Sequence, residues 1–119
     1  IMEIEYKLRK FKLWYFSISH AMLLIRSPKN DVWSTNIDIC FSSVEYIDCP
    51  VDLDSIMVEK PNLSDLNLIE KKLHKKINQS SITVFVSAEN RFYVVSEDIL
   101  ISENRNDYLD LPYDFVKLS

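Results

Sequence analysis

The sequence of 119 residues predicts an α+β domain, with a curved, mainly antiparallel sheet of about five to seven strands packed against one main helix. Three observations predict this class. Several short stretches alternate apolar and polar residues with the period of a half-buried strand, and one stretch, residues 64–78, repeats apolar residues at helical spacing. The order along the chain is strands, helix, strands. No linker or internal repeat divides residues 1–119, so we expect a single domain.

The first two predicted strands are rich in aromatic and aliphatic residues. Residues 11–18 alternate so that Trp14, Phe16 and Ile18 share one face, and residues 22–27 form a second apolar run that ends before a proline. Aromatic and β-branched side chains favour extended chain, and proline ends strands. We therefore expect two strands joined by a turn.

Residues 35–48 carry the clearest strand pattern. Ile37 and Phe41 share one face, but the apolar phase changes at Ser42 and Ser43. A change of phase within a strand indicates a β-bulge or a sharp bend, because side chains alternate strictly along a strand. The remaining strands are expected at residues 55–59, 82–87, 92–96 and 99–102, followed by a tail of turns and extended chain over residues 103–119.

The helix is expected over residues 64–78, where one apolar stripe runs through Leu66, Ile69, Leu73 and Ile77. Ser64 is the expected N-cap and Asn78 the expected left-handed C-cap. Leu63 and Leu68 occupy the positions of a hydrophobic staple.

The chain contains no glycine, whereas ordinary usage of ~7% would supply about eight. This absence excludes a Walker loop, a dinucleotide-binding fingerprint, a nucleophile elbow and an EF-hand loop, which all need glycine. Asparagine and aspartate tolerate a positive φ better than most residues. Turns that need a positive φ are therefore expected at Asn30, Asp31, Asn90, Asn104, Asn106 and Asp107.

Charge is distributed in blocks along the chain, whose net charge is −4. Residues 30–59 hold seven acidic and no basic residues, whereas residues 1–29 and 60–76 are net basic. Two interpretations stay open. The blocks could neutralise one another in the fold, or the acidic block could face a basic partner. In the second case the expected partner-binding residues are Asp48, Asp52, Asp54 and Glu59.

No catalytic, metal or cofactor site is predicted. The two histidines and two cysteines (His20, Cys40, Cys49 and His74) lack the close spacing of a zinc site, and we expect both cysteines to be reduced thiols. Basic residues alternate with aromatics over residues 6–15, a mixture that can bind single-stranded nucleic acid. The sequence pI of about 5.1 argues against that function.

One segment resembles part of a targeting signal. Residues 13–25 are uncharged and follow a basic stretch, but the run is too short to span a membrane. Glu3 and Glu5 precede it, and no small-residue cleavage motif follows. We therefore expect a cytoplasmic protein without a membrane segment.

The pattern Ser17-x-Ser19-His20, continued by Leu23-Leu24-Ile25-Arg26-Ser27-Pro28, resembles a family of small, uncharacterised bacterial proteins. The resemblance also takes in residues 36–39 and 44–46, and so covers about the first half of the chain. It implies a bacterial origin and draws attention to His20 and Arg26, but it implies no activity.

The leading functional hypothesis is a non-enzymatic protein-interaction domain, an inhibitor or immunity-type partner of a basic protein. The alternative is a small-molecule-binding domain with a pocket in the curved sheet, lined by His20, Arg26, Tyr46, Trp14 and Trp33. Arg26 could instead pair with Asp38 or Glu45 across the sheet, which is its expected role. A homo-oligomer formed through an edge strand is a third possibility.

Overall fold

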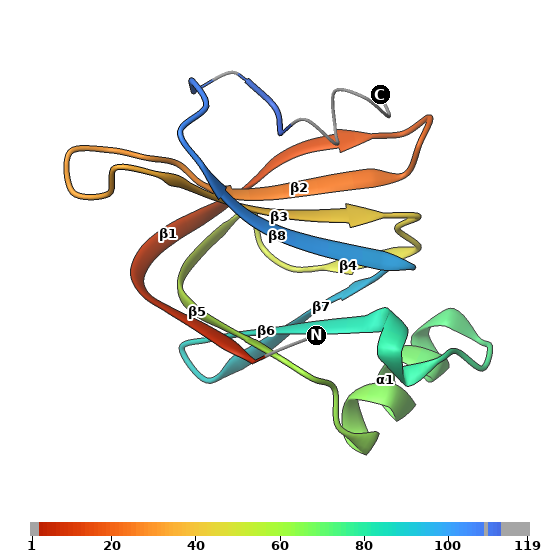
Figure 1. Ribbon diagram of the computed structural model, residues 1–119. Coiled ribbons are helices and arrows are strands. Elements are labelled where there is room, and N and C mark those ends of the chain that lie inside the picture. The colour runs from red at the N-terminus through yellow and green to blue at the C-terminus, as the bar shows by residue number, and fades with distance from the viewer. Residues whose placement is uncertain (1–2, 109, 113–119) are drawn as a thin grey trace.

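In the described part of the chain, eight antiparallel strands form one sheet that is not closed, and a single α-helix packs on it (Figure 1). The computed structural model describes residues 3–108 and 110–112, so part of the predicted tail, residues 113–119, lies outside the described residues. The predicted α+β class is confirmed. The strand order across the sheet is β4-β7-β6-β5-β1-β2-β3-β8. The elements are β1 (Ile4–Ser17), β2 (Met22–Ser27), β3 (Asn36–Ser42), β4 (Tyr46–Asp48), β5 (Asp52–Glu59), α1 (Leu63–Leu73), the short 3-10 helix η1 (Gln79–Ser81), β6 (Ile82–Ser87), β7 (Asn90–Val95) and β8 (Asp98–Asn104).

The predicted number of strands, about five to seven, was too low because the run 35–48 is two strands. The backbone turns at Ser43, whose φ is 51°. After this turn β4 pairs with β7 at one edge of the sheet, whereas β3 lies between β2 and β8 near the other edge. The bend expected at Ser42 and Ser43 is therefore present, and it moves the chain to a different part of the sheet.

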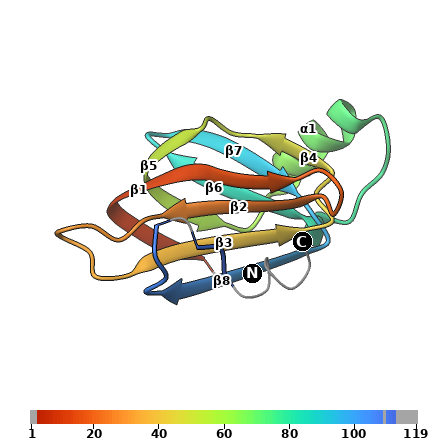
Figure 2. The same ribbon diagram turned by 90° about the horizontal axis from the view of Figure 1, so that it is seen from above.

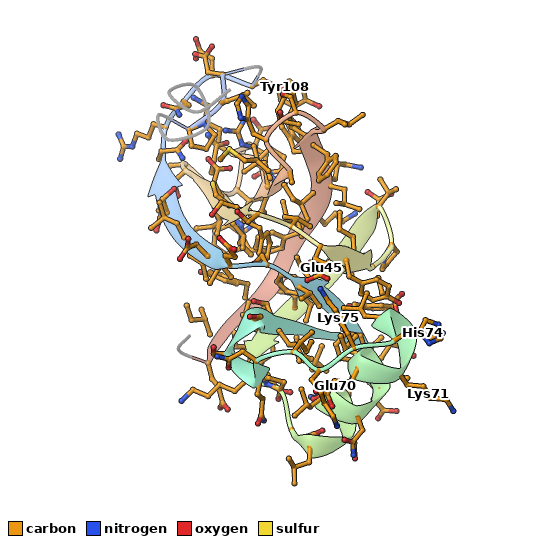
Figure 3. The ribbon with its side chains drawn as sticks, turned by 90° about the vertical axis from the view of Figure 1, so that its right-hand side faces the viewer. Glu45, Glu70, Lys71, His74, Lys75 and Tyr108 are labelled. Carbon is orange, nitrogen blue, oxygen red and sulfur yellow. The ribbon has the colours of Figure 1, made fainter. Side chains whose placement is uncertain are left out.

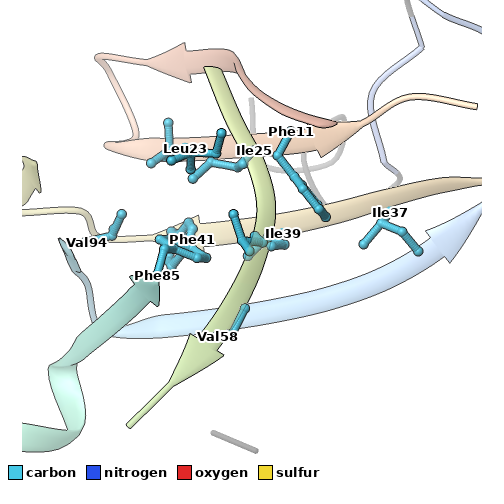
Figure 4. Close-up of a cluster of buried hydrophobic side chains, with 11 residues drawn as sticks. Phe11, Leu23, Ile25, Ile37, Ile39, Phe41, Val58, Phe85 and Val94 are labelled. Carbon is cyan, nitrogen blue, oxygen red and sulfur yellow. The ribbon is translucent and has the colours of Figure 1, made fainter. Parts of the chain in front are cut away.

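Strong bending of β1 and β5 curves the sheet (Figures 1 and 2). The pairing of β1 shifts register between Leu13 and Tyr15 on one side and between Tyr6 and Lys10 on the other. Such irregularities increase local bending and twist. The concave side is filled by apolar side chains that include Phe11, Leu23, Ile25, Ile39, Phe41, Ile56, Val58, Phe85 and Val94 (Figure 4). It is therefore a packed core.

Helix α1 packs on the other face of β6 and β7, where Ile69 is fully buried. Asn62 is its N-cap and forms a capping box with Asp65, while His74 is the left-handed C-cap with a φ of 57°. The predicted caps, Ser64 and Asn78, were wrong, and Asn78 instead caps η1. The predicted staple is also absent, since Leu63 is 70% exposed. Within the described residues no helix has the length and apolar character needed to cross a membrane.

The residues with a positive φ are not the asparagines and aspartates that the absence of glycine predicted. In the described residues they are Leu8, Ala21, Ser43, Ser55, His74, Ala88 and Glu89, and none is asparagine or aspartate. The asparagines contribute side-chain hydrogen bonds instead. Asn30 Oδ1, for example, accepts hydrogen bonds from the N–H groups of Val32 and Trp33, at 2.8 Å each. Asparagine is favoured in turns because it tolerates a positive φ and because its side chain can bond to the nearby backbone. Among the described asparagines, only the side-chain hydrogen bonds are seen.

The β6–β7 turn allows a test of the energetic cost of placing residues other than glycine or asparagine at a positive φ. Ala88 and Glu89 have φ values of 49° and 67° between the paired residues Ser87 and Asn90, as a two-residue type I′ turn requires. The double substitution Ala88→Asn/Glu89→Gly supplies the preferred residues and should raise the free energy of unfolding by about 1–2 kcal/mol in urea denaturation. Asp31→Gly, in a loop without a positive φ, is the control and should give no gain. Equal effects of both variants would contradict the interpretation.

Candidate functional site

Three turns that are distant in the sequence meet at one end of the sheet, on the right in Figure 1. Backbone hydrogen bonds join Val44 N to Ala21 O at 2.8 Å, Glu45 N to Val95 O at 2.8 Å, and Glu97 N to Ser42 O at 3.1 Å. We call residues 18–21, 43–45 and 96–98 the turn end. The arrangement depends on the short turn at residues 43–45, after which the chain leaves β3 and pairs with β7 as β4.

A pocket of about 190 Å³ opens beside the turn end. Its lining is mostly apolar and includes Met22 and Cys40, which are only 4% and 5% exposed. Leu100 stands at its margin and is 49% exposed, and Asp98 contributes a carboxylate. The volume equals that of roughly six water molecules at ~30 Å³ each, which is room for one side chain.

The turn end carries exposed carboxylates beside exposed apolar groups. Glu97 and Asp98, which we call the acidic rim, are both exposed and make no ion pair within the described residues. Glu45 is also exposed but is paired with Lys75, which follows α1 (Figure 3). Ile18 is 88% exposed in the β1–β2 turn. A surface of this kind is complementary to a partner segment with basic and apolar side chains.

Two of the four acidic residues chosen from the sequence are paired with basic residues of the same chain. Asp52 is paired with Lys12 of β1 at 2.6 Å, and Glu59 is paired with Arg91 at 2.9 Å. The two residues lie at opposite ends of β5, seven positions apart along a bent strand. Asp48 and Asp54 are exposed. Much of the acidic block is therefore neutralised by basic residues of the same chain, the first of the two interpretations left open by the sequence.

Glu59 belongs to a network that holds α1 against the sheet. Asp65 is 2% exposed and accepts hydrogen bonds from Arg91 Nη2 at 2.6 Å, Arg91 Nε at 3.0 Å and the Tyr93 hydroxyl at 2.8 Å. Its Oδ2 also accepts from Asn62 N at 2.8 Å. Burial by itself raises the pKa of Asp65, but these hydrogen bonds and the Arg91 charge outweigh it and lower the pKa. We assign this network to stability.

The five residues of the predicted small-molecule pocket lie in different places. His20 is exposed in the β1–β2 turn, whereas Arg26 is completely buried in β2. Trp33 stacks on the Arg9 guanidinium at 4.7 Å, and Tyr46 packs in the cluster beneath α1. Only Trp14 lies near Arg26, with its ring 5.4 Å from the guanidinium. The structure therefore does not bring His20 and Arg26 together.

Arg26 makes the cross-strand pair expected with Asp38. Its Nε and Nη2 donate to the two Asp38 carboxylate oxygens at 2.6 and 3.1 Å, and its Nη1 donates to Tyr108 O at 3.2 Å. Asn104 Nδ2 completes the arrangement by donating to Asp38 Oδ2 at 2.6 Å. Each guanidinium nitrogen is occupied by a group of the same chain, so Arg26 holds the segment after β8 on the sheet and is not placed to bind an external anion.

A second, larger depression lies near Trp33. It has a volume of about 460 Å³ and is lined by Leu8, Lys10, Lys12, Ser27, Pro28, Asn30, Val32 and Trp33. This volume falls within the ~300–1,000 Å³ range of small-molecule sites. Its two lysines lie opposite Asp54 and Asp52 in the β1–β5 pairing, which offsets their charge. It contains one of the five predicted pocket residues, Trp33.

Of the two cysteine thiols, Cys40 is buried and Cys49 is partly buried. Cys40 is buried in β3, and burial together with the Asp48 charge raises the pKa of Cys49 to about 11. A thiol with this pKa is almost entirely protonated at neutral pH and is a poor nucleophile. Among the residues that the structure describes, no group of three or more histidine, cysteine, aspartate or glutamate side chains is arranged to hold a metal ion.

Comparison with known proteins gives no match to a family model, a curated protein or a solved structure. The resemblance to small bacterial proteins stays a prediction. The geometry of the described residues is therefore the basis for any functional assignment.

Proposed function

We propose that this chain is a non-enzymatic protein-interaction domain that binds a basic partner at the turn end. The observation that carries the proposal is the apolar pocket beside the acidic rim, next to the half-exposed side chain of Leu100. The pocket can take one apolar side chain or the aliphatic stem of a lysine or arginine, while Glu97 and Asp98 attract basic residues that flank it. The net charge of −4 favours encounter with a basic partner.

The proposed partner is the basic protein expected from the sequence, but different residues are proposed to bind it. The acidic rim takes the place of Asp52 and Glu59, whose carboxylates are paired with Lys12 and Arg91. An inhibitor or immunity-type role in a bacterial cytoplasm remains part of the proposal. The predicted alternative is small-molecule binding in a pocket near His20 and Arg26. The depression near Trp33 is a different place, but its volume is sufficient for such a ligand.

A defined probe tests the proposal. The peptide Lys-Lys-Val-Thr-Val-Thr-Val-Lys-Lys should bind the full chain and shift backbone amide NMR signals of the turn end and β8. Added salt should weaken the binding, since exposed charges are screened. A peptide with glutamate in place of each lysine should not bind. Signals that shift around Leu8 and Trp33, or no shifts at all, would contradict the proposed site.

Two double variants with the same change in net charge separate a local effect from a general one. Glu97→Gln/Asp98→Asn removes the acidic rim and should weaken peptide binding about three- to ten-fold at low salt. Asp48→Asn/Asp54→Asn removes two exposed carboxylates elsewhere and should leave the affinity nearly unchanged. If both variants weaken binding equally, the effect depends only on net charge and the turn end is not the site.

A further inference from the structure

Among the strands that the structure describes, β8 is an edge strand with an open side. All of its residues pair with β3 in an unbroken register, from Asn36 opposite Asn104 to Ser42 opposite Asp98. Within the described residues no strand pairs with its other side, since β8 ends the sheet. In an antiparallel pair, every second residue directs its N–H and C=O groups away from the partner strand. The open side of β8 therefore presents a row of main-chain donors and acceptors.

The centre of β8 lacks the devices that usually protect an edge strand. It contains no proline, lysine or break in register, and the central residues 99–102 are uncharged. The other edge strand, β4, has only three residues. Leu100 is 49% exposed on one face of β8, while Ile99 and Ile101 are half-buried on the other. A strand added here would cover apolar surface on both faces.

Acidic residues flank this open edge. Asp98 stands at its start and Glu103 near its end, and both side chains are exposed. Glu103 Oε2 also accepts a hydrogen bond from the Thr35 hydroxyl, and its charge interacts with that of Arg9. Glu97 directly precedes the strand, and the pocket beside Leu100 lies at the same end. A segment aligned with β8 could therefore place an apolar residue in the pocket and basic residues beside the carboxylates at its two ends.

We infer that the partner contributes an extended segment, apolar at its centre and basic at its ends, that pairs with β8 as a ninth strand of the sheet. This inference rests on the proposed function and specifies how the partner is recognised. Charge complementarity selects this occupant over a second copy of the chain. Two copies, each with a net charge of −4, would bring identical acidic edges together.

The test compares the lysine-flanked probe peptide with a version that is N-methylated at every valine and threonine. N-methylation removes the main-chain donors but keeps the side chains and the charges. The methylated peptide should bind at least about ten-fold more weakly, because several main-chain hydrogen bonds are lost. In amide hydrogen exchange, the unmethylated peptide should protect every second amide of β8, namely those that do not bond to β3. Amides that already bond to β3 should change little.

Each of the other possible outcomes would contradict a specific claim. Equal binding of both peptides would refute strand addition and leave the proposed function intact. Failure of both peptides to bind would count against the proposed function itself. A free chain that sediments as a dimer, with the alternate amides of β8 already protected, would show that a second copy occupies the edge. That result would overturn the inference in favour of the predicted homo-oligomer.

Discussion

Arg26→Met is expected to lower the free energy of unfolding by about 3–5 kcal/mol. The Arg26 and Asp38 side chains are both 0% exposed, so the substitution leaves a carboxylate buried without its countercharge. Asn104 would still donate a hydrogen bond to it. Urea denaturation followed by fluorescence would measure the loss, and an unchanged slope against urea concentration would show that the denatured state is unaffected.

The double variant Arg26→Met/Asp38→Leu separates the loss of the pair from the burial of an unpaired charge. Replacing both partners by apolar residues of similar size removes the uncompensated charge, and so the free energy of unfolding should return to within about 2 kcal/mol of the original chain. A double variant as unstable as Arg26→Met would contradict this explanation. It would indicate that the contacts of Arg26 with Trp14 and Tyr108 matter more than the charge pair.

Asp65→Ala is expected to lower the free energy of unfolding by about 2–3 kcal/mol at neutral pH. It removes the acceptor for Arg91 and Tyr93 and one half of the capping box of α1. Asp54→Asn, at an exposed position of β5, is the control and should change stability by less than about 0.5 kcal/mol. Loss of helical circular dichroism at a lower denaturant concentration in Asp65→Ala would measure the effect.

The Asp65 network also predicts a pH dependence. The pKa of Asp65 is lower in the folded chain than its ordinary value of 3.8, so the folded state binds its proton less readily than the unfolded state. Its contribution to stability is therefore complete above the unfolded pKa and is lost as the pH falls toward the folded pKa, beginning below about pH 5. The difference in stability between the original chain and Asp65→Ala should shrink over this range. A difference independent of pH would contradict the role given to the carboxylate.

The periodicity of the sequence correctly predicted local structure where one face is buried. Residues 22–27 and 82–87 are strands, and Ile69 lies on the buried face of a helix. The prediction failed where several residue types could serve the same local purpose. Asn62 and Ser64 are both good N-caps, and Asn62 is used because the Asp65 carboxylate can accept a hydrogen bond from its N–H. The signal was present as an asparagine three residues before an aspartate.

The candidate site could be predicted only in outline. The charge blocks predicted an acidic surface within residues 30–59, but Asp52 of that block lies opposite Lys12 because β5 pairs with β1, forty positions away in the sequence. Glu97 and Asp98 adjoin the end of β3 and its turn because Ser42 lies beside Glu97 in the fold. Alternation of side chains predicts the face that a residue occupies and does not predict the strand that it adjoins.

By itself, the sequence determined the fold class, most strand positions, the helix and the exclusion of every site that needs a glycine loop, because these depend on local period and residue chemistry. The tertiary structure decided which charges are neutralised, that the concave side is a packed core, and that the turn end and the edge of β8 lie together. The physical reason is that these features depend on strand order and register. Both are set by the packing of residues far apart in the chain, such as Phe41 against Phe85.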